Sequence, residues 1–108
     1  MIHLKEIKAY VRPAMKDQVI DAVEELPDAP GLTVYDVEGW GKPKDGVHHK
    51  LTNQVLLEMT VSDAELDPVL EAIQESARTG NYGDGKIFVS DVNQAIRIRD
   101  GESGEAIV

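Results

Sequence analysis

Residues 54–89, QVLLEMTVSDAELDPVLEAIQESARTGNYGDGKIFV, decide the fold, because they contain a strand, a helix and another strand in succession. Residues 54–61 and 86–92 are short apolar runs, which indicates two strands. Between them, Ser62 and Glu65 form a capping-box pattern, which predicts the start of a helix. The helix itself is marked by one apolar stripe at helical spacing, formed by Leu66, Val69, Leu70, Ile73 and Ala77.

The N-terminal half predicts a matching set of elements. Alternating apolar residues between positions 7 and 11 indicate a strand, and apolar residues at helical spacing from Met15 onward indicate a helix that ends at Pro27. Residues 31–40, GLTVYDVEGW, predict a second strand, and residues 41–53 lack periodicity and predict a loop. The order β-α-β-β-α-β is that of the ferredoxin-like fold, an α+β sandwich in which one antiparallel sheet carries two helices on one face.

The sheet face opposite the helices is predicted to be apolar. Its apolar members in the predicted strands are Leu32, Val34, Leu56 and Phe88. Because such a surface is too apolar to favour water, we expect it to be buried against other copies of the chain. The sequence therefore predicts a homo-oligomer.

Length, charge and composition limit the classes of function. The 108 residues predict one domain, and 42% hydrophobic and 29% charged residues are ordinary values for a globular protein. Twenty Asp and Glu against eleven Lys and Arg give a net charge of −9, which disfavours binding to nucleic acid. The absence of cysteine excludes thiolate nucleophiles and thiolate metal sites. No segment has the pattern of a membrane span or of a cleavable leader, so we expect a cytoplasmic protein that is not embedded in a membrane.

The glycine-rich stretch 79–86, TGNYGDGK, lies between the second predicted helix and the last strand. Glycines at such a turn can adopt positive φ angles and let backbone N–H groups approach a ligand, and Lys86 adds a positive charge, so the stretch could hold a phosphate. It could equally be a helix C-cap at Gly80 followed by a tight Asp-Gly turn. The spacing excludes a P-loop, because no Ser or Thr follows the lysine and the next element is a strand.

Two further features have both a structural and a functional interpretation. Arg97 and Arg99 lie two positions apart, so on extended backbone they would point to the same side and could clamp phosphate oxygens, or pair with the excess carboxylates of the chain. Gly39 and Gly41 flank Trp40, where they could admit a ring against the backbone or form a hinge for the loop.

Four segments of the sequence resemble the PII signal-transduction proteins. They are TGNYGDGKIFV (79–89), AIRIRDGESGEA (95–106), LTVYDVEGWG (32–41) and KEIKAYVRP (5–13). The resemblance covers nearly the whole chain, with the motifs in the family's order and spacing. It implies a ferredoxin-like domain assembled as a trimer, with adenine nucleotides bound in the three clefts between subunits.

The resemblance also implies a set of nucleotide-binding residues. The stretch 79–86 matches the phosphate-binding B-loop of the family, whose phosphate contacts fall on Gly83, Asp84, Gly85 and Lys86. Positions near the adenine, the ribose and the phosphates fall on Thr33, Gly39, Gly41, Lys42 and Glu58. The two arginines that reach a nucleotide across the subunit boundary fall on Arg97 and Arg99, at the start of the C-terminal tail 97–108.

Residues 41–53 match the T-loop of the family but depart from its pattern. The segment is several residues shorter than in nitrogen-signalling members and lacks the tyrosine or serine that they modify, so covalent modification is not expected. Pro43 replaces a glutamine that contributes to Mg-ATP and 2-oxoglutarate binding, and Gln54 aligns with the lysine that pairs with the 2-oxoglutarate carboxylate. Standard 2-oxoglutarate sensing is therefore not expected, and the chain resembles a divergent PII-like branch. Lys50, within the predicted loop, is expected to contribute little to ligand binding.

The function implied is non-enzymatic regulation. ATP, ADP or AMP, with or without Mg, would bind between subunits and order the T-loop, which would engage or release a membrane transporter or an enzyme. No obligatory cofactor is expected. His48 and His49 leave open a trimeric metal-binding or metal-tolerance module, although adjacent side chains on extended backbone point in opposite directions. A bicarbonate-responsive PII-like regulator is a further alternative.

Overall fold

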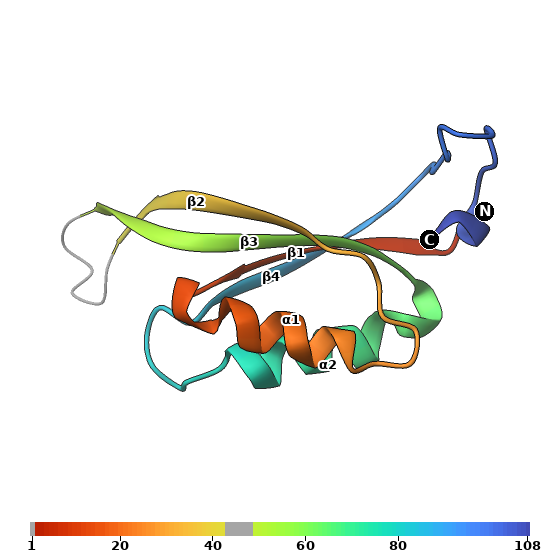
Figure 1. The fold of residues 1–108 in the computed structure, drawn as a ribbon. Helices are drawn as coiled ribbons and strands as arrows, with labels where there is room; N and C mark the ends of the chain where they lie inside the picture. Colours follow the sequence, from red (N-terminus) through yellow and green to blue (C-terminus); the bar gives the residue numbers. More distant parts are fainter. Residues whose placement is uncertain (1, 43–48) are drawn as a thin grey trace.

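The computed structural model describes residues 2–42 and 49–108, which form one antiparallel sheet covered on one face by two helices (Figure 1). The strands are β1 (Leu4–Val11), β2 (Thr33–Gly41), β3 (Lys50–Ser62) and β4 (Gly85–Asp91), and they lie in the order β2-β3-β1-β4. The helices are α1 (Lys16–Glu24) and α2 (Leu66–Ala77). Short 3-10 turns, Pro13–Met15 and Asp63–Glu65, lead into the two helices, and a third, Glu105–Ile107, lies near the C-terminus. The predicted β-α-β-β-α-β order is confirmed.

The core lies between the sheet and the two helices. In β1, Ile7, Ala9 and Val11 point toward the helices and are at most 2% exposed, as expected for a strand with one buried face. Buried apolar side chains of the helices pack against these strand residues, among them Val19 and Val23, which lie four positions apart on one face of α1. Matching periods of two in the strands and about 3.6 in the helices therefore position the sheet and the helices relative to each other.

The strand β3 begins earlier than the sequence indicated. It starts at Lys50 and pairs with β2 through to its end, where Lys50 lies opposite Gly41. The predicted loop 41–53 is therefore wrong at its C-terminal boundary, because residues 50–53 belong to a hairpin whose backbone pairing needs no buried side chains. Pro43 and His48 lie outside the described residues.

The predicted capping box is also wrong. The Ser62 side chain makes no capping hydrogen bond, and a 3-10 turn precedes α2. The backbone N–H of Asp63 instead donates to the carbonyl oxygen of His3 at 2.9 Å. The turn before the helix is thus held by the backbone of His3, just before β1, rather than by the Ser62 side chain.

The uncovered sheet face is less apolar than predicted. Val34 lies opposite the buried Leu57, so it shares the helix-covered face, and Leu32 packs against the core. The prediction was wrong for these two residues because the pairing register between β2 and β3 determines which side chains point toward the helices. Leu56, opposite Tyr10, and Phe88 do lie on the uncovered face, and Phe88 is 55% exposed there and contacts the ring of Tyr10 edge-on. Charged side chains from β1 and β3 share that face.

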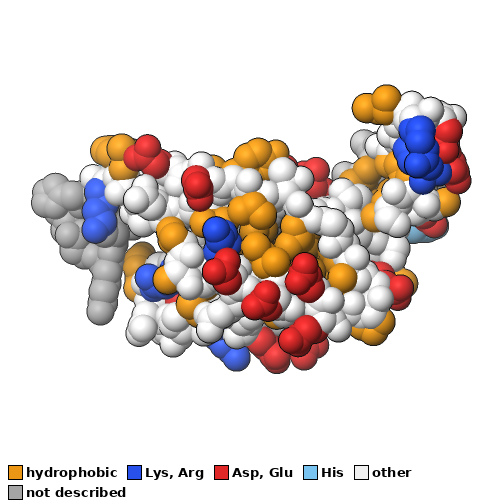
Figure 2. Space-filling model, in the orientation of Figure 1, with side chains coloured by type: hydrophobic (Ala, Val, Ile, Leu, Met, Phe, Trp, Pro, Cys, Tyr) orange, Lys and Arg blue, Asp and Glu red, His pale blue; other side chains and the backbone are white. Residues whose placement is uncertain are grey.

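The C-terminal segment leaves the sheet after β4 and turns back, so that the two termini lie close together (Figure 1). A bridge between Ile96 and Ser103 closes a hairpin in this segment, and the backbone N–H of His3 donates to the Glu105 carboxylate. On the face shown in Figure 2, many acidic side chains gather over the helical layer with a few basic ones among them, and both kinds lie on the C-terminal segment.

Candidate functional site

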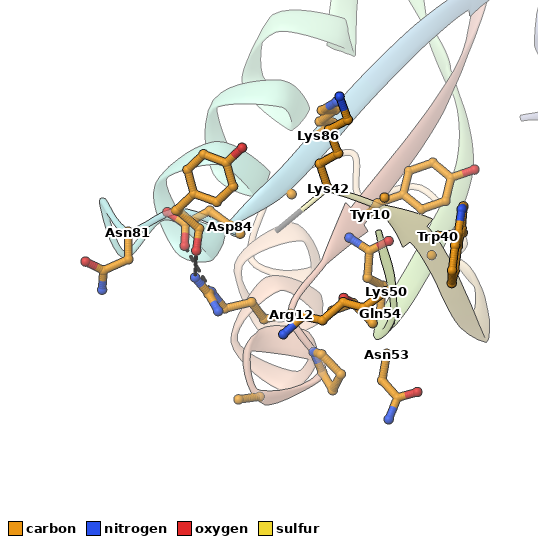
Figure 3. A pocket seen from close by; sticks show the side chains of 18 of the residues that line it. Tyr10, Arg12, Trp40, Lys42, Lys50, Asn53, Gln54, Asn81, Asp84 and Lys86 are labelled. Atoms are coloured by element: carbon orange, nitrogen blue, oxygen red, sulfur yellow. Dashed lines mark hydrogen bonds and ion pairs between the residues drawn. The ribbon is translucent and has the colours of Figure 1, made fainter. Parts of the chain in front are cut away.

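A groove of about 1230 Å³ lies where the β2–β3 hairpin, the end of β1 and the loop between α2 and β4 meet (Figure 3). It contains seven of the candidate residues from the sequence, namely Gly39, Gly41, Lys42, Gly83, Asp84, Gly85 and Lys86. Segments from both halves of the chain therefore form one site.

The glycine-rich loop needs glycine for two separate reasons. Gly80, Gly83 and Gly85 have φ angles of 86°, 99° and 110°, a region that other residues rarely adopt. At Gly85 a Cβ atom would also lie 1.8 Å from the carbonyl oxygen of Tyr10, because Gly85 pairs with Val11 across the sheet. The tight turn and the close approach to β1 are thus both encoded in TGNYGDGK.

Asp84 uses its carboxylate to organise this loop. It accepts hydrogen bonds from the backbone N–H groups of Thr79 and Gly80 at 2.8 and 2.9 Å and from the Thr79 hydroxyl at 2.5 Å. These bonds, the Thr79 hydroxyl first, together with the Arg12 guanidinium, hold the pKa of Asp84 well below its usual range. The carboxylate is therefore ionised at neutral pH and directed into the loop, whose conformation its hydrogen bonds stabilise.

Arg12 is a groove residue that the sequence did not single out. Its Nε donates to Oδ1 of Asp84 at 3.1 Å and its Nη2 to the carbonyl oxygen of Tyr82 at 2.7 Å (Figure 3). The one available signal was its position, directly after β1 and before Pro13, in the segment KEIKAYVRP. Its proximity to the loop depends on β1 and β4 being neighbours in the sheet.

Three lysines line the groove, Lys42 directly after β2, Lys50 at the start of β3 and Lys86 in β4. Within the described part of the chain, none of the three forms an ion pair, whereas Lys5 and Lys8 each contact two carboxylates. Lys50 belongs to β3 and lines the groove, so its assignment to a loop was wrong, whereas its small contribution to ligand binding stays a prediction. The described part of the groove therefore carries three lysines without an ion-pair partner there, in a protein of net charge −9.

Aromatic and amide side chains form the hairpin wall of the groove. The ring of Trp40 stacks on that of His49, with centroids 5.8 Å apart, and Trp40 is 68% exposed. Gly39 leaves room for the Gln54 amide, since a Cβ there would lie 2.7 Å from Oε1 of Gln54. No group of three His, Cys, Asp or Glu side chains suited to a metal ion occurs in the described ranges 2–42 and 49–108.

Four candidate residues lie outside this groove. Thr33 and Glu58 face each other across β2 and β3, and the Glu58 carboxylate accepts a hydrogen bond from the Tyr35 hydroxyl at 3.1 Å, which raises the pKa of Tyr35. Arg97 and Arg99 lie in the C-terminal hairpin, where Arg97 pairs with Asp100 and Glu102. Figure 1 places this hairpin away from the end of the sheet where β2 finishes and β3 begins. Within one chain, these residues do not complete the groove.

The motifs and the fold agree with those of known proteins. Residues 4–102 match the family model described as nitrogen regulatory protein P-II. The chain is 40% identical to nitrogen regulatory protein P-II 2 of Methanothermobacter thermautotrophicus, and the match covers 100% of both chains. The protein belongs to the P-II family. It is also 40% identical to the nitrogen regulatory protein P-II of Rhodobacter capsulatus, with 97% of this chain and 100% of the relative covered.

Two solved structures of P-II proteins resemble the fold closely. The PII protein of Arabidopsis thaliana bound to citrate has a TM-score of 0.83 and is 38% identical, with 97% of this chain and 92% of that chain covered. The GlnK-ATP complex of B. subtilis has a TM-score of 0.86 and is 28% identical, with 97% and 95% covered. P-II proteins are regulatory signal transducers and not enzymes. In the described ranges, no helix has both the length and the apolar character that crossing a bilayer requires.

Proposed function

We propose that this P-II protein binds an adenine nucleotide, with the phosphates held by the loop 79–86 and Lys86. The observation that carries the proposal is the groove itself, in which a positive-φ glycine loop converges with three lysines that form no ion pair within residues 2–42 and 49–108. Backbone N–H groups in such a loop and lysine ammonium groups are the donors that phosphates prefer. The two solved relatives are complexes with ATP and with citrate, both polyanions, which supports an anionic ligand here.

The proposal includes a homotrimer. Arg97 and Arg99 lie away from the groove of their own chain, so they would contact the nucleotide of a neighbouring subunit, as the family resemblance implies. The exposed ring of Phe88 on the uncovered sheet face supports burial in such an assembly. Thr33 and Glu58, on the same face, would then lie near the subunit boundary and contact the adenine.

The regulatory output would come from the segment that joins β2 to β3. Lys42, directly after β2, and Lys50, the first residue of β3, flank this segment and also line the groove, so bound ligand would favour some positions of the segment over others. We propose that it contacts a transporter or an enzyme in the cytoplasm. Because Pro43 and Gln54 replace two family residues, 2-oxoglutarate is not the expected second effector.

Calorimetry with ATP, ADP and AMP tests the ligand. Lys86→Ala removes one charge-assisted contact to phosphate, so affinity should fall by about tenfold to a hundredfold. Lys16→Ala is the matched control, because Lys16 lies on α1 outside the groove. ADP should compete well with ATP, since Pro43 cannot help to orient a metal ion. Equal losses for the two variants, or no nucleotide binding by the wild type, would contradict the proposed function.

A further inference from the structure

Arg12 connects two elements that are distant in the sequence. It follows the last residue of β1, and its two hydrogen bonds reach Asp84 and Tyr82 in the loop between α2 and β4. The two donors, Nε and Nη2, belong to one planar guanidinium, so the two bonds together fix both the position and the orientation of the loop. A lysine ammonium could carry the same charge but could not reproduce this two-point contact.

The loop also packs closely on the guanidinium. A Cβ atom at Gly83 would lie 3.3 Å from Nη2 of Arg12, so a side chain there would press on the arginine. Gly83 also has a φ angle of 99°. The absence of a side chain therefore permits both the positive φ angle of the turn and the close contact with Arg12. Arg12 is 34% exposed along its side chain and lines the groove beside these residues.

The charges of the loop indicate a second role for Arg12. Residues 79–86 contain one carboxylate, Asp84, and one ammonium group, Lys86, so the loop alone has no net charge to attract a phosphate. The Arg12 guanidinium neutralises Asp84, which leaves the charge of Lys86 and the backbone N–H donors available. Without it, an anion in the groove would meet a carboxylate that only hydroxyl and amide groups stabilise.

We propose that Arg12 is the positioning residue of the phosphate-binding loop, which it holds in its binding conformation through Asp84 and Tyr82 while neutralising Asp84. This inference rests on the proposed nucleotide function and adds a residue that acts through the loop rather than through the ligand. It also gives a reason for an arginine at this position, directly after β1 and before Pro13.

The decisive variant is Arg12→Lys, which keeps the charge and removes the two-point contact. We expect amide hydrogen exchange at residues 79–85 of the ligand-free protein to accelerate by about tenfold, and ATP affinity measured by calorimetry to fall by about tenfold. Arg78→Lys is the matched control, because Arg78 adjoins the loop but does not line the groove. It should leave both measurements unchanged.

A double-mutant cycle separates a specific contact from general loosening of the fold. If Arg12 acts through Asp84, then Arg12→Lys made in an Asp84→Asn background should reduce ATP affinity by much less than tenfold. Exchange in β1 and β3 should stay at wild-type values in every variant, which monitors the fold. Additive losses in the cycle would overturn the proposal.

The two measurements also separate this inference from the proposed function. Wild-type loop exchange and wild-type ATP affinity in Arg12→Lys would show that charge alone suffices, and Arg12 would not be a positioning residue. If the wild-type protein binds no ATP, the proposed function fails, and exchange at residues 79–85 still decides the role of Arg12. Faster exchange only in Arg12→Lys would then support it, and equal exchange would overturn it.

Discussion

Replacement of Gly85 by alanine should be among the most damaging single changes in this protein. The φ angle of 110° costs a non-glycine residue about 1–2 kcal/mol. The new Cβ would lie 1.8 Å from the carbonyl oxygen of Tyr10, so β4 would have to move away from β1 at the point where Gly85 pairs with Val11. Adding the lost strand pairing, we expect the free energy of unfolding to fall by roughly 3 kcal/mol or more.

Two other glycines provide matched controls for the two causes of this loss, which are backbone strain at positive φ and the clash of the new Cβ atom with Tyr10. Gly80 has a φ angle of 86° with no atom within 4 Å of its would-be Cβ, so Gly80→Ala tests backbone strain alone and should cost about 1–2 kcal/mol. Gly31 has neither a positive φ angle nor a neighbour within 4 Å, so Gly31→Ala should change stability by less than about 0.5 kcal/mol.

Urea unfolding measures these differences. Circular dichroism reports the whole fold, and fluorescence of Trp40, the one tryptophan of the chain, reports the β2–β3 hairpin. All variants must be compared at one protein concentration, because association would shift apparent stability. If Gly85→Ala is no less stable than Gly80→Ala, the close approach of β4 to β1 at Tyr10 is not as the structure shows it.

Two further predictions concern pH and assembly. Because the hydrogen bonds of Thr79 and the Arg12 guanidinium lower the folded-state pKa of Asp84, its contribution to stability is present above the unfolded pKa of about 4 and is lost as pH falls further. Asp84→Asn should therefore be less stable than wild type at pH 7 in urea unfolding, with a difference that shrinks below about pH 4; a difference that grows on acidification would contradict this. Light scattering should give three times the chain mass of 11.9 kDa, and a stable monomer that still binds nucleotide would refute the trimeric site.

Much of the architecture followed from local patterns, and the errors have a common physical cause. The buried stripes of β1, β3 and α2 were predicted because burial imposes a period of two or of 3.6 on apolar residues. The hairpin residues 50–53 were missed because all four are exposed and paired only through their backbone. The faces assigned to Leu32 and Val34 were wrong because β2 is mostly exposed, so its own pattern does not show which side meets the core.

The sequence by itself determined the element order, the glycine-rich loop with Lys86 and the family, since these depend on short-range periodicity and on contiguous motifs. Only the tertiary structure decided that Arg12, directly after β1, holds Asp84, that Lys50 lines the groove, and that Arg97 lies away from the groove of its own chain. Contacts of this kind join residues about 70 positions apart, Arg12 and Asp84 being the example. They depend on which strands are neighbours in the sheet and on their register, which no local pattern of residues specifies.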